Sequence, residues 1–225
     1  MESPINRRQI FKNSIFVGAA GIASVAGIAN AQEICRVNGT TPEQTEGPFY
    51  PITPHADTDA DLTIVEGETE RARGEIVDLW VLVQDENCKP IPNALVDLWQ
   101  ACATGKYDHP NDPNEAEVDP LFQYWAKVLT DKSGLAKIRT IKPGAYPASD
   151  TWYRPPHIHF KVSGEGFEEL TTQMYFAGEA LNRKDLILLQ MKPVDRTKVT
   201  VRFTRTSARA LPKGIFTVTL KSAAV

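Results

Sequence analysis

Short runs of apolar or alternating residues, separated by turn residues, recur from about residue 73 to the end of the chain. Alternation of apolar and polar side chains is typical of strands that bury one face, and clusters of turn residues such as 85–90 and 131–134 divide the runs. Helical periodicity is weak, and we expect only a short helix within 179–189. The runs predict strands at 76–83, 94–100, 126–130, 136–140, 157–162, 170–176, 199–205 and 216–220.

Short strands at this spacing predict an all-β fold, a two-sheet β-sandwich with long loops. Residues 108–120 contain several prolines and are expected to form one of these loops. Prolines also limit regular strand pairing within 32–72, which we expect to be an extended N-terminal arm. The sequence is therefore divided into residues 1–31, the arm 32–72 and a β-sandwich domain 73–225.

The first 31 residues have the pattern of an export signal rather than of a folded element. Paired Arg7 and Arg8 precede an uncharged run, 13–32, which is rich in Ala and Gly and contains Ala29-Asn30-Ala31. A basic start, an apolar stretch and a small-residue cleavage site predict a signal peptide, and the paired arginines resemble a twin-arginine signal. We expect recognition by the twin-arginine export machinery and a periplasmic or secreted protein. An uncleaved membrane anchor is the alternative.

The charge balance narrows the classes of partner. The 225 residues include 25 Lys and Arg against 28 Asp and Glu, which gives a net charge of -3. Binding to nucleic acid needs a dense basic face, so no nucleic-acid partner is expected. Hydrophobic residues make up 42% and charged residues 24%, a globular composition that excludes a disordered chain and a multi-span membrane protein.

Three cysteines, Cys35, Cys88 and Cys102, stand in a chain that is predicted to reach an oxidising compartment. An odd number permits one disulfide and leaves one thiol. Their spacing matches no zinc motif, and the sequence leaves the pairing open.

The strongest chemical signal is a pair of histidines at positions 157 and 159. Side chains two residues apart on a strand point to the same face, about 6 to 7 Å apart, so His157 and His159 can bind one metal ion. A packed or surface histidine pair is the alternative. Two histidines rarely complete a site, and the neighbouring candidates are Tyr107 and Tyr146, each near Gly or Pro at a predicted strand end. A lone tyrosine is more often part of a core or its rim.

Several motifs, taken in order, resemble one family. They are T-E-G-P-F-Y-P at 45–51, G-x-Y at 105–107, P-G-x-Y-P at 143–147, R-P-x-H-I-H-F at 154–160 and T-Q-x-Y-F at 172–176. This order is similar to that of the intradiol ring-cleavage dioxygenases, which include protocatechuate 3,4-dioxygenase and catechol 1,2-dioxygenase. The resemblance runs from about residue 41 to residue 176.

The resemblance implies a non-haem Fe(III) centre whose ligands are Tyr107, Tyr146, His157 and His159. It implies that O2 and a catechol are the substrates, and that the ring is cleaved between its two hydroxylated carbons to give a cis,cis-muconate-type diacid. By the same analogy Tyr146 leaves the metal and accepts a catechol proton. Arg154 would stabilise negative charge on the ring, and Gln173 would hydrogen-bond near the reacting oxygens.

The donor chemistry agrees with this resemblance, since phenolate is a hard anionic ligand that favours Fe(III). Two features depart from the family. Ala148 stands where the protocatechuate branch often has a bulky aromatic, and the arm is too short for the helical dimerisation segment of the catechol branch. Because the four expected ligands lie in one chain, we expect a homo-oligomer or a monomer. Lys106 and Arg139 are candidates to meet a substrate carboxylate, with solvated surface charge as the alternative.

Two other functions remain open from the sequence. A transthyretin-like β-sandwich binding module would share the strands up to Tyr107 but would need neither Tyr146 nor the histidine pair. An exported zinc or copper protein could use His157 and His159 without phenolate ligands. The identity of the catechol, the pathway it serves and signal cleavage are not determined by the sequence.

Overall fold

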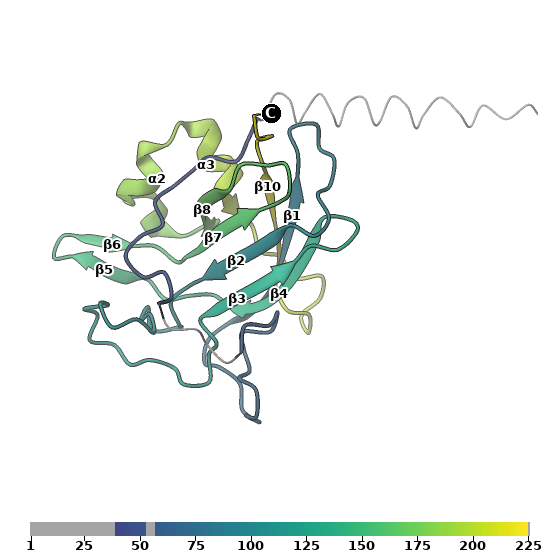
Figure 1. Cartoon of the computed structure of the whole chain (residues 1–225). Coiled ribbons are helices and arrows are strands. Elements are labelled where there is room, and N and C mark those ends of the chain that lie inside the picture. Colours follow the sequence, from purple (N-terminus) through teal and green to yellow (C-terminus); the bar gives the residue numbers. More distant parts are fainter. Residues whose placement is uncertain (1–38, 53–56, 225) are drawn as a thin grey trace, which may run out of the picture.

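Two packed β-sheets form the body of the protein in the computed structural model, which describes residues 39–52 and 57–224 (Figure 1). The predicted all-β sandwich is confirmed. One sheet has five strands in the order β3 (Trp125–Leu129), β2 (Leu95–Trp99), β7 (His157–Ser163), β8 (Leu170–Phe176) and β9 (Thr200–Val201). The other has three, in the order β10 (Lys213–Thr219), β1 (Ile76–Gln84) and β4 (Leu135–Ile141). A separate hairpin pairs β5 (Tyr146–Ser149) with β6 (Trp152–Arg154).

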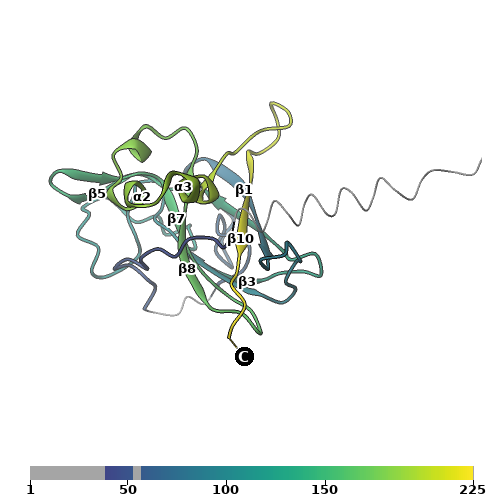
Figure 2. The ribbon, with the colours of Figure 1, turned by 90° about the horizontal axis from the view of Figure 1, so that it is seen from above.

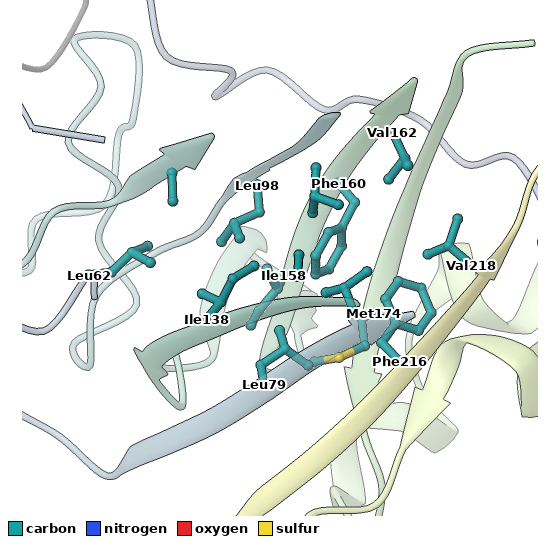
Figure 3. Close-up of a cluster of buried hydrophobic side chains, with 14 of the residues drawn as sticks. Leu62, Leu79, Leu98, Ile138, Ile158, Phe160, Val162, Met174, Phe216 and Val218 are labelled. Carbon is teal, nitrogen blue, oxygen red and sulfur yellow. The ribbon is translucent and has the colours of Figure 1, made fainter. Parts of the chain in front are cut away.

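The core lies between the two sheets and is built from the inward positions of alternating strands. Strand β1 buries every second residue from Val77 onward, as its alternating sequence predicts. Phe216 of β10 meets Phe160 of β7 across the sandwich, with ring centroids 5.1 Å apart. Figure 3 shows the facing side chains, which include Leu79, Ile138, Phe216 and Val218 on one side and Leu98, Ile158, Phe160 and Met174 on the other.

Strand β7 is buried on both faces, and this gives the histidine pair its setting. Ile158 and Phe160 enter the core, so His157 and His159 face away from the three-stranded sheet. The N-terminal arm, dark purple in Figure 1, covers this outer face. The backbone N–H of Gln44 in the arm donates to the carbonyl of Thr171 in β8 at 2.9 Å. The outer face of the five-stranded sheet is therefore shielded from water by the chain's own N-terminal part.

Three short helices follow β8 and lie beside the β5–β6 hairpin, as the two views agree (Figures 1 and 2). They are a 3-10 helix, η1 (Ala180–Arg183), and the α-helices α2 (Leu186–Gln190) and α3 (Pro193–Val199). The sequence predicted one short helix within 179–189 and missed α3, which starts at a proline in the first helical position.

The other predicted strands are present with ends shifted by a few residues, but the strand predicted at 199–205 is wrong for most of its length. Only Thr200–Val201 pairs with β8. Phe203 then leaves the sheet and stacks on Phe176 at a centroid distance of 4.8 Å. The hairpin β5–β6 was not predicted, because prolines and a short polar turn interrupt its alternation. Residues 108–120 form a long loop without regular strands or helices, as expected.

The predicted export signal, its cleavage site and Cys35 lie outside the described residues. Within 39–52 and 57–224, no helix has the length and apolar character needed to cross a bilayer. Cys88 takes part in a disulfide, whereas Cys102 is a free, buried thiol. Pairings that use Cys102 are therefore excluded, and the predicted domain boundaries stay predictions.

Candidate metal centre

The two histidines of β7 bring their Nε2 atoms together. His157 and His159 are each 2% exposed, and their Nε2 atoms lie 3.1 Å apart. Within the sheet, His157 pairs in register with Tyr175 of β8, and His159 lies between Trp99 of β2 and Gln173 of β8. The imidazole of His159 stacks on the Trp99 indole with centroids 5.0 Å apart and an interplanar angle of 14°. Neighbouring strands thus hold both rings in fixed orientations.

The protonation of His157 follows from one hydrogen bond. Its Nδ1 lies 2.7 Å from the carbonyl oxygen of Pro155, which can only accept, so Nδ1 carries the proton. A neutral imidazole then has its lone pair on Nε2, the atom that faces His159. Burial, followed by the nearby charge of Arg154, lowers the pKa of His157 well below its usual value and the pKa of His159 to about 3. Both rings are neutral at pH 7, which is the form that binds a metal.

Tyr107 and Tyr146 come to the same point from two loops. The hydroxyl of Tyr107 lies 3.5 Å from Nε2 of His157, and the rings of Tyr107 and Tyr146 meet edge to face at 5.6 Å. Tyr146 begins β5, and its ring centroid lies 5.7 Å from that of His157. All four residues predicted from the sequence are therefore neighbours, although they come from three separate segments.

Two glycines allow the tyrosine loops to touch through their backbones. Gly105 and Gly144 each stand two residues before a tyrosine, and the N–H of Gly144 donates to the carbonyl of Cys102 at 2.9 Å. Gly105 has φ of +84°, and a Cβ there would lie 2.5 Å from the carbonyl oxygen of Ala145. Only glycine fits this close approach, so the G-x-Y spacing in both motifs has a structural cause.

The donor set fits a metal ion that accepts nitrogen and phenolate ligands. Separations of 3.1 and 3.5 Å between donor atoms are those expected when each bonds one ion at about 2.1 Å. Among the described residues no three His, Cys, Asp or Glu side chains gather to hold a metal, so a site here needs the phenols. Burial, and next the neighbouring Tyr146, raise the pKa of Tyr107 well above 10. Burial likewise raises the pKa of Tyr146. A bound cation reverses this preference, because it stabilises the phenolate form.

Arg154 lies beside the four side chains and is held by a buried ion pair. Its Nε donates to Asp185 at 2.7 Å, and its Nη2 donates to Oε1 of Gln173 at 2.7 Å. Asp185 is fully buried and also caps α2 by accepting from the N–H of Leu188. Burial disfavours the charged guanidinium, but Tyr175, Tyr146 and Asp185 outweigh it and raise the pKa of Arg154. The site therefore keeps a permanent positive charge.

A pocket of about 290 Å³ opens onto these residues. Tyr146, Arg154 and His159 line it, whereas Tyr107, His157 and Gln173 are buried and do not line it. Gln173 is fully buried, and its Nε2 donates to the carbonyl of Thr45 at 2.8 Å. A larger hollow of about 460 Å³ lies beside 118–124 and includes none of the six predicted site residues. The remaining lining residues of the smaller pocket are Thr45, Gly47, Pro48, Phe49, Asp112, Pro113, Pro147, Ala148, Trp152 and Ile187.

Lys106 and Arg139, the candidates for a substrate carboxylate, do not line this pocket. The Lys106 ammonium donates to the carbonyls of Asp112 and Asn114. Arg139 lies in the other sheet and pairs with Asp78 of β1 at 2.9 Å. Neither side chain is therefore placed to meet a substrate in this pocket; Arg139 is partly exposed, whereas Lys106 is mostly buried and is not the solvated surface charge of the alternative.

Sequence reasoning missed three residues that shape the site: Asp112, Trp152 and Asp185. Asp112 sits in a loop that shows no periodicity, and Trp152 belongs to the hairpin that was not predicted. Asp185 carried a usable signal, since an aspartate directly before Leu186-Ile187-Leu188-Leu189 is a typical N-cap. Nothing in the sequence indicated that the same carboxylate pairs with Arg154.

Comparison with known proteins assigns the family. A family model described as "Dioxygenase" matches residues 45–208. The protocatechuate 3,4-dioxygenase beta chain of Burkholderia cepacia is 38% identical over 159 residues, which cover 69% of this chain and 68% of that protein. The catechol 1,2-dioxygenase of Acinetobacter baylyi is 30% identical over 162 residues, which cover 66% of this chain and 50% of that protein. The chain thus spans about half the length of this catechol relative.

A solved structure agrees in fold. The dioxygenase domain of a dioxygenase and carbohydrate-binding protein fusion from Streptomyces sp. SirexAA-E superposes with a TM-score of 0.61 at 29% identity. The match covers 82% of this chain and 100% of that domain. Together with the geometry of the site, these matches show that the chain belongs to the intradiol ring-cleavage dioxygenase family.

Proposed function

We propose that this protein is a non-haem Fe(III) dioxygenase that cleaves the ring of a catechol between its two hydroxylated carbons with O2, giving a cis,cis-muconate-type diacid. The observation that carries the proposal is the convergence of two neutral imidazoles and two phenols, with His157 Nε2 3.1 Å from His159 Nε2 and 3.5 Å from the Tyr107 hydroxyl. Family membership supports the same reaction class.

Tyr107, Tyr146, His157 and His159 would hold the iron. When bound, ferric iron supplies Lewis acidity and covalency with the catechol oxygens, which opens the ring to O2. Two phenolates reduce the net charge of a trivalent ion in a buried site, and the hydrogen bond from His157 Nδ1 to Pro155 keeps the lone pair on Nε2. Because phenolate is a hard anionic donor, such a ligand set favours Fe(III) over Fe(II).

Tyr146 is the residue best placed to exchange with substrate. It is the one tyrosine of the pair that lines the pocket, and the three residues that follow it in β5 are exposed. Its phenolate oxygen can accept a proton from a catechol hydroxyl as the substrate enters, which is general-base chemistry. Tyr107 is buried, does not line the pocket and would stay in place.

Arg154 supplies positive charge on the pocket wall, where negative charge develops on the ring and its oxygens. The buried carboxylate of Asp185 fixes the guanidinium at its Nε, and Gln173 fixes it at Nη2. Gln173 therefore acts through Arg154 in this arrangement, because its amide oxygen and nitrogen both have protein partners.

The arm closes the site against water. A Cβ on Gly47 would lie 3.2 Å from Cε1 of His159, so the arm backbone packs directly on the imidazole. Phe49 then packs on Tyr107, with ring centroids 4.8 Å apart. Exclusion of water strengthens the electrostatic effect of Arg154 on a bound substrate.

The visible spectrum of the purified, iron-loaded protein tests the ligand set. Ferric tyrosinate absorbs visible light by charge transfer, so the protein should be red-brown, and Tyr107→Phe should shift or weaken the band. A colourless protein with one iron per chain would contradict phenolate ligation. If the protein purified without added iron instead holds zinc or copper at full occupancy, the exported zinc or copper protein is favoured.

Export and self-association complete the proposal. The paired arginines and the small-residue cleavage site support passage through the twin-arginine machinery to the periplasm or medium. The disulfide at Cys88 agrees with an oxidising compartment. One chain carries the complete proposed ligand set, so the active species is a monomer or a homo-oligomer.

A further inference from the structure

We propose that the pocket selects uncharged catechols with an apolar ring substituent and discriminates against catechols that carry a carboxylate, such as protocatechuate. The inference rests on the proposed ring cleavage and concerns the walls of the same pocket. It departs from the name of the Burkholderia relative, and it follows from the charges and side chains around this pocket.

The cations near the pocket already have carboxylate partners. Arg154 is the one Lys or Arg side chain on the pocket wall among the described residues, and it is paired with the buried Asp185 at 2.7 Å. The Lys106 ammonium lies 4.0 Å from a carboxylate oxygen of Asp112 and donates hydrogen bonds to two backbone carbonyls. Two cations therefore face two carboxylates. A third carboxylate, on a substrate, would enter without a Lys or Arg side chain to pair with, and a buried unpaired charge is strongly unfavourable.

Asp112 adds a fixed carboxylate to the residues that line the pocket. It lines the pocket, its side chain is 2% exposed, and its two oxygens accept from the backbone N–H groups of Tyr107 and Asn114 at 2.7 and 2.8 Å. These bonds hold the carboxylate in place, so it cannot turn away from an anionic ligand. Trp152 also lines the pocket, and its indole Nε1 has no hydrogen-bond partner among the described residues. This N–H could donate to a substrate carboxylate, but a neutral donor does not neutralise the charge of the carboxylate.

The rest of the wall suits a hydrocarbon substituent. Phe49, Pro113, Trp152 and Ile187 present apolar surface to the pocket, and Ala148 leaves room at its exposed rim. An alkyl group placed against these side chains is removed from water, which contributes about 0.8 kcal/mol for each buried methylene. A carboxylate at the same place would lose its hydration without gaining a partner.

Steady-state ring cleavage of catechol, 4-methylcatechol and protocatechuate at pH 7 tests the inference, since the carboxylate of protocatechuate is ionised there. We expect kcat/KM for protocatechuate to be at least about tenfold below that for 4-methylcatechol. Equal or faster cleavage of protocatechuate would overturn the inference and leave the proposed function intact. If the iron-loaded protein cleaves none of the three, the proposed function itself fails.

A variant that adds a positive charge to the pocket tests whether charge, rather than pocket shape, causes the discrimination against a carboxylate. Ile187→Arg adds a cation at a half-buried lining position, and Leu186→Arg adds the same charge at the exposed neighbour that does not line the pocket. Ile187→Arg should lower the ratio of kcat/KM for 4-methylcatechol to kcat/KM for protocatechuate by at least about fivefold. Leu186→Arg should leave this ratio nearly unchanged. An equal effect of both variants, or no effect of Ile187→Arg, would contradict the assignment of the discrimination to pocket charge.

Binding without turnover gives a readout that is independent of the reaction. Calorimetric titration with the unreactive monophenols 4-methylphenol and 4-hydroxybenzoate should give a lower dissociation constant for 4-methylphenol, again by at least about tenfold. The ratio of the dissociation constant of 4-hydroxybenzoate to that of 4-methylphenol should fall in Ile187→Arg and stay the same in Leu186→Arg. Tighter binding of 4-hydroxybenzoate to the unmodified protein would overturn the inference even if turnover rates agreed with it.

Discussion

At the scale of single residues, the histidine pair depends on burial and on one hydrogen bond. The Pro155 carbonyl accepts the Nδ1 proton of His157, and burial keeps both imidazoles neutral. The two Nε2 lone pairs are therefore available at one point, 3.1 Å apart. The period of a strand predicted this shared face from the sequence alone, because every second side chain points the same way.

Replacing His157 by alanine should remove the metal. His157→Ala leaves three protein ligands, and we expect iron affinity to fall by at least about a hundredfold, measured as iron per chain after dialysis against a chelator. His109→Ala is the matched control, because His109 is also buried but accepts the N–H of Asn111 and does not line the pocket. Full iron and activity in His157→Ala would show that the site is wrongly assigned.

Tyr146→Phe should separate substrate exchange from iron retention. Because Tyr146 lines the pocket and Tyr107 does not, loss of the Tyr146 hydroxyl should slow catechol binding or release more than it lowers the iron content. Stopped-flow mixing with catechol without O2 measures the binding step. Tyr153→Phe, at a position 53% exposed, controls for loss of a phenol on the same hairpin. An iron-free Tyr146→Phe protein would contradict the exchange role.

At the scale of elements, the site depends on the contact between the two tyrosine loops. The sequence predicted the tyrosines through motif resemblance, but it did not predict the hairpin β5–β6 that carries Tyr146 and Arg154. Local pattern could not reveal it, since Pro147 breaks the alternation and the pairing is irregular between Pro147 and Ser149. The contact of Gly105 with Ala145 joins loops far apart in sequence, and no local signal encodes such a contact.

Gly105→Ala should destabilise the protein and weaken iron binding together. The added Cβ meets the Ala145 carbonyl at 2.5 Å, and the residue has a positive φ, so we expect a loss of about 3 kcal/mol in unfolding free energy. Gly166→Ala is the control, because Gly166 has a nearly equal φ of +83° but open space around it, and it should lose only about 1 kcal/mol. If urea unfolding gave equal losses of unfolding free energy for Gly105→Ala and Gly166→Ala, the contact between the two tyrosine loops would not contribute to stability.

The link between α2 and Arg154 makes Asp185 a positioning residue. Asp185→Asn removes the charge partner of a buried guanidinium, a change that costs about 3 to 5 kcal/mol in stability. Ring cleavage should slow while iron content is kept. A double-mutant cycle with Arg154→Gln should be strongly non-additive in kcat, and Asp195→Asn, in the first turn of α3, should change little. Additive effects would mean that Asp185 acts only on stability.

At the scale of the whole molecule, strands far apart in the sequence bury the centre, and the arm covers it. Tyr50 of the arm donates to the buried Asp97 of β2 at 2.9 Å, and Gln44 bonds β8 through its backbone and its amide. Strand periodicity predicted the sandwich and proline content predicted the extended arm, but the surface on which the arm packs depends on long-range contacts. The sequence also left open which cysteine is free.

Cysteine titration tests the proposed export of the chain through the redox state of its cysteines. Cys88 is disulfide-bonded and Cys102 is free and buried, so a thiol reagent should find one thiol in denaturant and none in the native protein. Cys102→Ser should abolish the signal, and Cys88→Ser should increase it. Three thiols in the denatured, purified protein would contradict passage through an oxidising compartment.

The measurement that tests the central claim most directly is O2 consumption by the iron-loaded protein with 4-methylcatechol, combined with mass identification of the product. The account predicts that one O2 is consumed for each catechol and that the product is a methyl-substituted cis,cis-muconate containing both oxygen atoms. A product in which the ring has been cleaved at a bond other than the one between the two hydroxylated carbons would contradict the account. So would the absence of O2 uptake by protein with full iron.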